Sequence, residues 1–393
     1  MKQKFNMNLG KTVLAVYICI LVTTSTQGQE KEGYKLGKGI HLVSADSFSL
    51  KFSARIQSLY QAEIINASSE FNDGFQIRRA RLKFDGFAYT KKLQYKIELA
   101  IANSDINSGA IPESGNTANI VLDAYVKWNF AGKWSLWFGQ TKLPGNRERV
   151  ISSQALQFVD RSNVNARFNI DRDAGVQLHY NGNKVNLAGA LSMGEGRNMV
   201  IQNKGGYGYT MRAEFLPFGK FTGKGDYFAS DLVREPSPKL SVGITYDLND
   251  RASRERGQLG DFMTAERDLS TWFADAHYKY NGFSSLIEYA HKSAPQGPVI
   301  RDVEGNFQDA FYTGEGFSGQ AGYLFTSNLE LAGRYTAVIP EHSTGRNKNV
   351  QYTFGVSKFF AEHSLKIQTD LTLIREDTKE DQLLYRLQLE LGF

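Results

Sequence analysis

Apolar and polar residues alternate along most of the chain from Phe48 onward. In the clearest example, residues 93–101, apolar side chains at every second position are separated by Gln94, Lys96 and Glu98. A β-strand has this period of two because successive side chains point to opposite faces of a sheet. The alternation predicts sixteen strands, at residues 48–61, 74–90, 93–101, 120–130, 133–141, 173–181, 184–193, 206–217, 238–248, 271–281, 283–292, 317–327, 329–338, 349–360, 363–375 and 383–393.

The connections between these strands are of two kinds. Short turns are expected at residues 90–92, 131–133, 181–183, 281–282 and 327–328. Long polar stretches are expected at residues 64–73, 103–117, 142–171, 219–237, 249–270, 293–316, 340–347 and 376–382. This pattern predicts antiparallel hairpins rather than parallel strands joined by helices. The uneven lengths place the long stretches on the extracellular side, opposite short periplasmic turns.

Composition narrows the class of protein. Aromatic residues make up 12% of the 393 residues, which is too many for a disordered chain, and the mean hydropathy is −0.39. After residue 28 no apolar run reaches the ~18 residues of a membrane-spanning helix. A membrane barrel is polar on average because only one face of each strand meets lipid. Residues 385–393 place their apolar side chains on one face and end in Phe393, which is typical of the last strand of an outer-membrane barrel. We therefore predict one 16-stranded antiparallel transmembrane β-barrel over residues 48–393.

The first 28 residues have the features of a cleaved secretory signal. Lysines lie on the N-terminal side of a short apolar stretch, residues 12–22, and small residues follow it. Residues 29–47 are then expected to form a short periplasmic segment, and the cell outer membrane is the expected location. Loss of the three lysines would lower the formal charge from +5 to +2, which argues against a nucleic-acid-binding protein. The single cysteine, Cys19, lies in the same stretch, so the mature chain has no thiolate for a metal site.

Three cations share one face of the predicted strand 74–90. Arg79, Arg81 and Lys83 alternate with small or apolar residues. A charge on the lipid face would cost about 2–4 kcal/mol near the bilayer midplane, so these three side chains are expected to face the water-filled lumen. Arg78 has the opposite parity and indicates either a bulge or a position at the membrane interface. The three cations would attract anions into the pore, or they would pair with carboxylates on neighbouring strands, such as Glu98 and Asp123.

A second group of cations lies in the third long connection. Residues 141–173 contain Arg147, Arg149 and Arg161 among six cations and four acids. The segment is too long for an idle connection, and apolar residues between positions 150 and 161 have helical spacing. We expect it to carry a short helix, to fold into the lumen and to narrow the channel. Guanidinium groups there would suit phosphate and carboxylate oxygens. The alternative is a surface loop with local ion pairs.

Five short motifs in this part of the chain resemble the phosphate-selective porin O and P family of Gram-negative bacteria. They are FQIRRARLKFDG at 75–86, LDAYV at 122–126, FGQTKLP at 138–144, FVDRS at 158–162 and RDAGVQL at 172–178. The resemblance implies a sixteen-stranded channel, usually trimeric, with an inward-folded third loop. It further implies an arginine-lined, anion-preferring path, in which Arg79, Arg81 and Lys83 line the wall while Arg147, Arg149 and Arg161 lie in the constricting loop.

The predicted function is a passive outer-membrane channel for small, phosphate-like anions, and it needs neither a cofactor nor a metal. One alternative is a barrel-embedded hydrolase. The six histidines are scattered, however, and neither a Gly-x-Ser-x-Gly nor a His-Glu-x-x-His motif is present, so no catalytic residue is assigned. The other alternative is a non-conducting structural or adhesion barrel, whose lumen would be filled by folded-in loops.

Overall fold

The computed structural model describes residues 36–65, 70–106 and 119–393. The predicted signal peptide, residues 1–28, lies outside these ranges, and the predicted periplasmic segment 29–47 lies within them only from residue 36 onward. Residues 36–393 form one compact unit.

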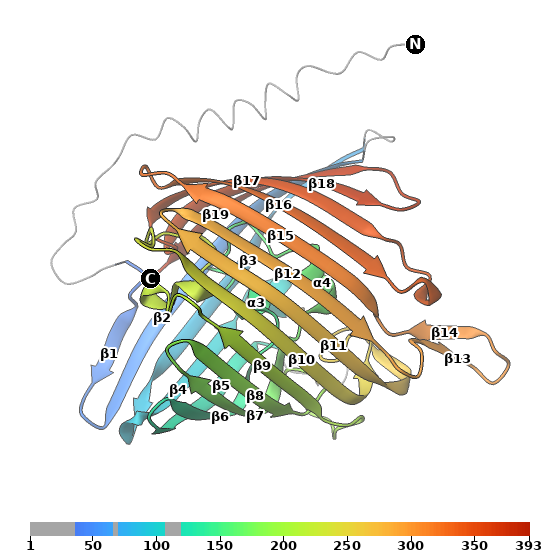
Figure 1. Ribbon diagram of the computed structural model, residues 1–393, viewed down its shortest axis with the longest axis horizontal. Helices are drawn as coiled ribbons and strands as arrows, with labels where there is room; N and C mark the ends of the chain where they lie inside the picture. The colour runs from blue at the N-terminus through green and yellow to red at the C-terminus, as the bar shows by residue number, and fades with distance from the viewer. Residues whose placement is uncertain (1–35, 66–69, 107–118) are drawn as a thin grey trace, which may run out of the picture. The chain divides into compact units, whose positions relative to one another are not determined.

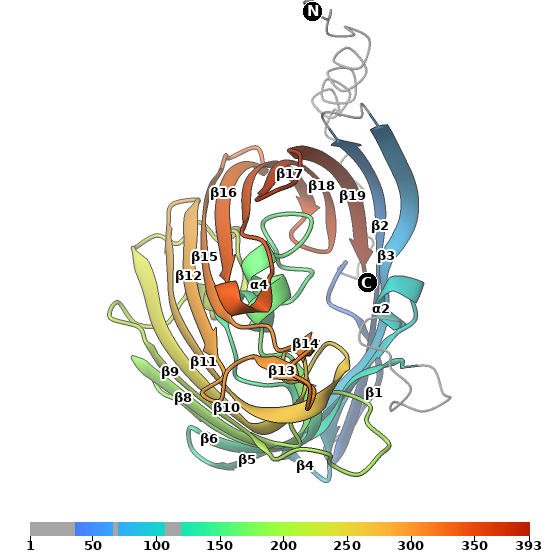
Figure 2. The same cartoon turned by 90° about the vertical axis from the view of Figure 1, so that its right-hand side faces the viewer.

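Sixteen antiparallel strands close into a barrel, as predicted (Figures 1 and 2). Each strand pairs with the next along the chain, and the ladder between β19 and β2 closes the ring. The barrel strands are β2 (Phe48–Ile65), β3 (Glu70–Ala88), β4 (Thr90–Ala100), β5 (Val121–Ala131), β6 (Trp134–Lys142), β7 (Arg172–Asn181), β8 (Val185–Ser192), β9 (Gly208–Phe215), β10 (Lys239–Arg254), β11 (Phe262–Tyr280), β12 (Phe283–Ser293), β15 (Gly314–Leu324), β16 (Leu329–Pro340), β17 (Asn349–Ala361), β18 (Leu365–Glu376) and β19 (Gln382–Gly392).

The two faces of the strands differ as the alternation predicts. On β5, Val126 and Trp128 are exposed on the outer surface, whereas Asp123 is buried on the inner face. The same division recurs on β6, where Phe138 is exposed and Thr141 is buried. Apolar side chains therefore cover the outside of the barrel, where a bilayer would surround it, and polar side chains fill the inside.

One long connection lies at the end of the barrel opposite to the end that the sequence suggested. Strand order places residues 216–238, between β9 and β10, at the end that carries the short turns and the C-terminus. The connection 193–207, between β8 and β9, takes its place among the long loops. The predicted loop 249–270 is also wrong, because most of it extends β10 and β11. Strand ends that project beyond the bilayer have water on both faces, so they lose the apolar alternation that marks a strand.

Three short strands are additional to the barrel. β1 (Ile40–Ser44) pairs with the first residues of β2, next to the point where β19 ends opposite Arg55. It therefore covers the edge of β2 that the closing strand leaves free. β13 (Val299–Arg301) and β14 (Phe307–Ala310) form a separate hairpin in the connection between β12 and β15.

The helices are short: α2 (Asn103–Ile106), α3 (Arg147–Val150), α4 (Asn163–Phe168) and the 3-10 turns η2 (Thr222–Tyr227) and η3 (His342–Thr344). None of the helices in the described ranges is long and apolar enough to cross a membrane. The helix expected between positions 150 and 161 is absent, and α3 and α4 flank that stretch instead. Its apolar residues pack in different directions. Ile151 and Leu156 contact Leu286 on β12, whereas the Phe158 ring lies at Gly355 on β17.

Candidate functional site: the barrel interior

The connection 143–171, between β6 and β7, contacts the inner faces of strands across the barrel. Asn146 donates a hydrogen bond to Glu288 on β12 over 2.8 Å, and Gln157 donates to Glu330 on β16 over 2.9 Å. The backbone N–H of Val159 donates to Asp370 on β18 over 3.0 Å. In Figure 2, α4 of this connection lies within the ring of strands.

Glycines on the wall allow this close approach. A Cβ atom at Gly316 on β15 would lie 2.8 Å from the Phe168 ring, and one at Gly355 on β17 would lie 2.9 Å from the Phe158 ring. Both values are below ordinary contact distance, so a larger residue at either position would displace the connection. Phe168 further packs in a buried cluster with Phe273 on β11. Buried side chains of the connection 143–171 therefore pack against this side of the interior.

The connection 216–238 enters the interior from the end with the short turns. The backbone N–H of Ala229 donates to the carbonyl of Ala155 over 2.9 Å, which joins the two inward segments. Ser230 donates to Glu330 over 2.7 Å, and the Lys279 Nζ donates to the carbonyls of Gly225 and Ser230 over 2.9 and 2.7 Å. Two segments that begin at opposite ends thus meet inside the barrel.

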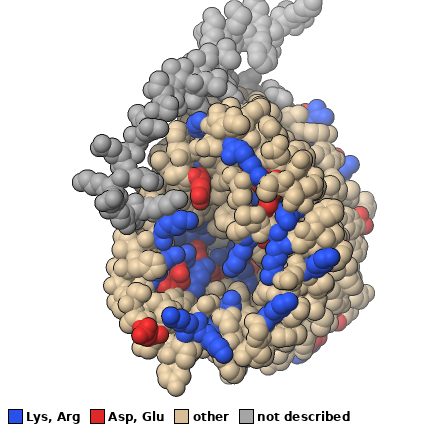
Figure 3. Space-filling model, turned by 60° about the vertical axis from the view of Figure 1, so that its left-hand side comes forward, with Lys and Arg blue, Asp and Glu red and all other residues tan. Residues whose placement is uncertain are grey.

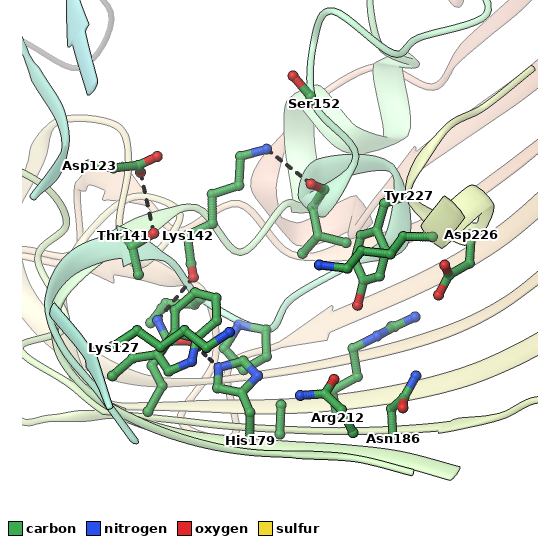
Figure 4. A pocket seen from close by; sticks show the side chains of 18 of the residues that line it. Asp123, Lys127, Thr141, Lys142, Ser152, His179, Asn186, Arg212, Asp226 and Tyr227 are labelled. Carbon is green, nitrogen blue, oxygen red and sulfur yellow. Dashed lines mark hydrogen bonds between the residues drawn. The ribbon is translucent and has the colours of Figure 1, made fainter. Parts of the chain in front are cut away.

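A cavity of about 710 Å³ remains between these segments and the strands β4 to β9 (Figure 4). Arg81 on β3 also lines it. Eight cationic and four acidic side chains line it, together with an aromatic group on the strand wall. The cations are Arg81, Lys96, Lys127, Lys142, Arg172, Arg212, Lys220 and Lys224, and the acids are Glu98, Asp123, Glu214 and Asp226. Figure 3 shows Lys and Arg side chains around a hollow in the molecular surface.

The three predicted wall cations differ in their surroundings. Arg81 lines the cavity, but it is held by Asp105 at 3.0 Å and by Glu98 at 3.3 Å. Arg79 is only 3% exposed and donates to Asp160 of the connection 143–171 over 2.8 Å. Lys83 lies 3.3 Å from Asp85 on its own strand and does not line the cavity. The sequence left open whether these cations pair with carboxylates on neighbouring strands, and Arg81 does pair with Glu98.

The three predicted loop arginines lie away from the cavity lining. Arg147 is completely buried and pairs with Glu214 at 2.7 Å and with Asp275 at 3.3 Å. Arg149 pairs with Asp171. Arg161 donates to the backbone carbonyls of Glu148 and Ile151 over 3.0 and 2.7 Å. These guanidinium groups fasten the connection to the wall and to itself.

Asp160 fixes the tip of this connection to β3. It accepts hydrogen bonds from Arg78 over 2.7 Å and from Arg79 over 2.8 Å. Arg78 occupies a β-bulge, because Gln57 pairs with Arg79 while the next residue, Ser58, pairs with Ile77. The bulge turns two consecutive arginines toward one carboxylate. Burial alone would raise the pKa of the Asp160 carboxyl, but the two guanidinium groups outweigh burial and hold this pKa well below its usual range.

All four acids that line the cavity are paired with cations. Glu98 and Asp123 both contact Lys96, at 2.7 and 2.6 Å, and Asp123 also contacts Arg172. Glu214 and Asp226 both face Arg147, at 2.7 and 3.9 Å.

Three lysines in the cavity lining were missed by the sequence interpretation. Lys127, Lys220 and Lys224 form no ion pair with any residue in the described ranges. Lys127 has the inward parity of β5, so the alternation could have indicated it. Lys220 and Lys224 lie on the connection 216–238, whose inward course has no signal in the local sequence.

The family model for phosphate-selective porin O and P matches residues 51–384. The chain belongs to this family. As a member of this porin family with a closed barrel, the protein is an outer-membrane channel protein. An uncharacterized protein of Aquifex aeolicus is 22% identical over 305 residues, which are 69% of this chain and 67% of that protein.

Solved porin structures share the fold at low sequence identity. An anion-selective porin from Comamonas acidovorans is 12% identical with a TM-score of 0.55, and the match covers 88% of this chain and all of that one. The trimer form of OmpT from Vibrio cholerae is 10% identical with a TM-score of 0.55 and the same coverage. OmpF of Salmonella typhi in complex with daunomycin is 14% identical with a TM-score of 0.55, covering 89% of this chain and all of that one.

Proposed function

We propose that the protein is a passive channel that prefers small anions such as phosphate, which cross the interior along the cavity beside β4 to β9. The observation that carries the proposal is the charge of this cavity. Cations outnumber acids eight to four, and each acid is already paired. Unpaired cations in a confined passage attract anions and repel cations, and single, flexible ammonium groups release an anion readily.

In this proposal, the six cations that the sequence predicted to line the pore have different roles. Arg81 contributes to the positive wall, while Arg79, Arg147, Arg149 and Arg161 hold the connection 143–171 in place. Lys83 adds charge outside the cavity. Lys127, Lys220 and Lys224 contact the passing anions. Passage down a gradient requires no cofactor, and the residues that line the path hold and release anions without chemical change.

The working unit in this proposal is a homotrimer in the outer membrane, reached after cleavage of a signal peptide at residue 28. The support for a trimer is the family itself and the trimer form in which OmpT, a protein of similar fold, was solved. Residues 48–393 form the transmembrane barrel, and residues 29–47 form its periplasmic lead-in.

Reversal potentials in a planar bilayer with a potassium chloride gradient test the proposal. We expect the reversal potential of the unmodified channel to have the sign that indicates anion preference. It should shift toward zero when Lys127, Lys220 and Lys224 are all replaced by Gln. The matched control replaces three exposed lysines that do not line the cavity, Lys91, Lys133 and Lys184, and keeps the original potential. Cation preference in the unmodified channel, or equal potentials for the two triple variants, would reject the proposal.

A further inference from the structure

The strand wall of the cavity carries a stack of three rings. The Tyr125 and Trp137 rings lie 4.9 Å apart at an interplanar angle of 3°, and the Trp137 and His179 rings lie 4.4 Å apart at 23°. They come from the neighbouring strands β5, β6 and β7, and all three line the cavity. In Figure 4, His179 and Lys127 lie on this wall, with Tyr227 and Asp226 across the cavity.

The apolar ring surface of this stack does not stabilise a small hydrated ion through the hydrophobic effect. Apolar surface gains free energy only when it excludes water against another apolar surface. A solute that benefits from the stack must therefore carry an apolar part as well as a charge. The cavity volume of about 710 Å³ lies within the roughly 300–1,000 Å³ of pockets that bind organic ligands.

The orientation of the rings favours a flat aromatic solute. Both faces of Trp137 are covered by its two neighbours, so the part of this ring that meets the cavity is its edge. The edge of an aromatic ring carries partial positive charge and the face carries partial negative charge, so ring edges attract the face of another aromatic ring. A saturated ring of the same size has no such face.

A cation lies directly beside this stack. Lys127 is the ladder partner of Trp137, and its Nζ lies 5.3 Å from the centroid of the Trp137 ring. Lys224 approaches the same cavity from the connection 216–238. A carboxylate bonded to an aromatic ring could contact the ammonium group of Lys127 while the ring covers the edges of the stack.

We infer that this wall is a binding site for aromatic carboxylates, formed by Tyr125, Trp137 and His179 with Lys127. The inference rests on the proposed anion channel and names a class of solute that this channel selects. The competing explanation is that the stack only stabilises the wall through cross-strand contacts, which would affect folding but not the choice among anions.

Blockade of the chloride current through single channels tests the inference. The probes are benzoate and cyclohexanecarboxylate, which are both fully ionised at pH 7 and similar in size. We expect benzoate to block at a two- to tenfold lower concentration, the range of one favourable ring–ring contact. Trp137→Leu should bring this ratio to one, while Lys127→Gln should weaken block by both anions and leave the ratio unchanged. Trp128→Leu is the matched control, because Trp128 lies on β5 but is 50% exposed on the outer surface.

Equal block by the two probes in the unmodified channel, or a ratio that survives Trp137→Leu, would overturn the inference. Tyr125→Leu replaces Trp137→Leu in the same measurement if the latter fails to fold. The potassium chloride reversal potential is recorded on the same membranes. If anion preference persists without a benzoate advantage, only the aromatic site is rejected, whereas cation preference rejects the anion channel itself.

Discussion

The two sides of the barrel interior differ in what lies against the strand wall. Along β12 and β15 to β18, glycines such as Gly316 and Gly355 admit the rings of the connection 143–171, and charged groups there are buried in hydrogen bonds. Along β4 to β9, aromatic and lysine side chains border open space. In the proposed channel, a cation inside the barrel is available to a solute only when no carboxylate or carbonyl already holds it.

The ion pairs that hold the connection 143–171 should respond most strongly to loss of Arg147. Arg147→Leu leaves Glu214 and Asp275 with one cation fewer in a completely buried position. Breaking such a buried network costs about 3–5 kcal/mol. We expect the folded form to be lost at a lower temperature in heat-modifiability gels. Arg251→Leu removes an exposed arginine that lies 3.9 Å from Asp250, and it should change stability by less than about 1 kcal/mol. If Arg147→Leu and Arg251→Leu lost their folded forms at the same temperature, the buried ion pairs of Arg147 would not stabilise the barrel.

Asp160→Asn tests whether an arginine that is held by a carboxylate attracts anions once the charge of that carboxylate is removed. This substitution removes the charge that holds Arg78 and Arg79, and it should destabilise the attachment of the connection 143–171 by about 1–3 kcal/mol. Two guanidinium groups lose their carboxylate at the same time, so anion preference should rise. Single-channel recordings should show more frequent current fluctuations together with a larger reversal potential. Asp381→Asn is the control, because Asp381 pairs with Arg375 at an exposed site. A smaller reversal potential in Asp160→Asn would contradict the idea that pairing decides availability.

The smallest expected effect is that of mild acid on the unmodified channel. The pKa of Asp160 is held well below its usual range, so its contribution to stability is present above its unfolded pKa, about 3.9, and is lost only as the pH falls through the lower folded value. Current fluctuations should therefore be the same at pH 8 and pH 5. An increase at pH 5 that Asp160→Asn removes would show that the carboxylate titrates in this range.

Much of the barrel could be predicted from the sequence because its rule is local. A lipid-facing side chain must be apolar and its neighbour in the strand faces water, so each strand repeats the same alternation, from Phe48 to Phe393. The same parity indicated the inward direction of Arg79 and Arg81. The opposite parity of Arg78 left a bulge or an interfacial position open, and the structure shows the bulge. β10 has 16 residues and β11 has 19, more than the roughly 9–11 that a membrane-spanning strand needs, so this rule does not reach their ends and the predicted ends were wrong.

The sequence alone determined that the chain alternates as a membrane barrel does, and that cations concentrate on inward positions. Only the tertiary structure decided which of those cations line the cavity and which are held by carboxylates. Asp160 and Asp275 lie 81 and 128 residues along the chain from Arg79 and Arg147, their respective partners, and the inward course of the connection 143–171 brings each pair together. An ion pair depends on distance in space, and no local pattern at Lys127 or Lys224 records that neither lysine has an ion pair among the residues that the structure describes.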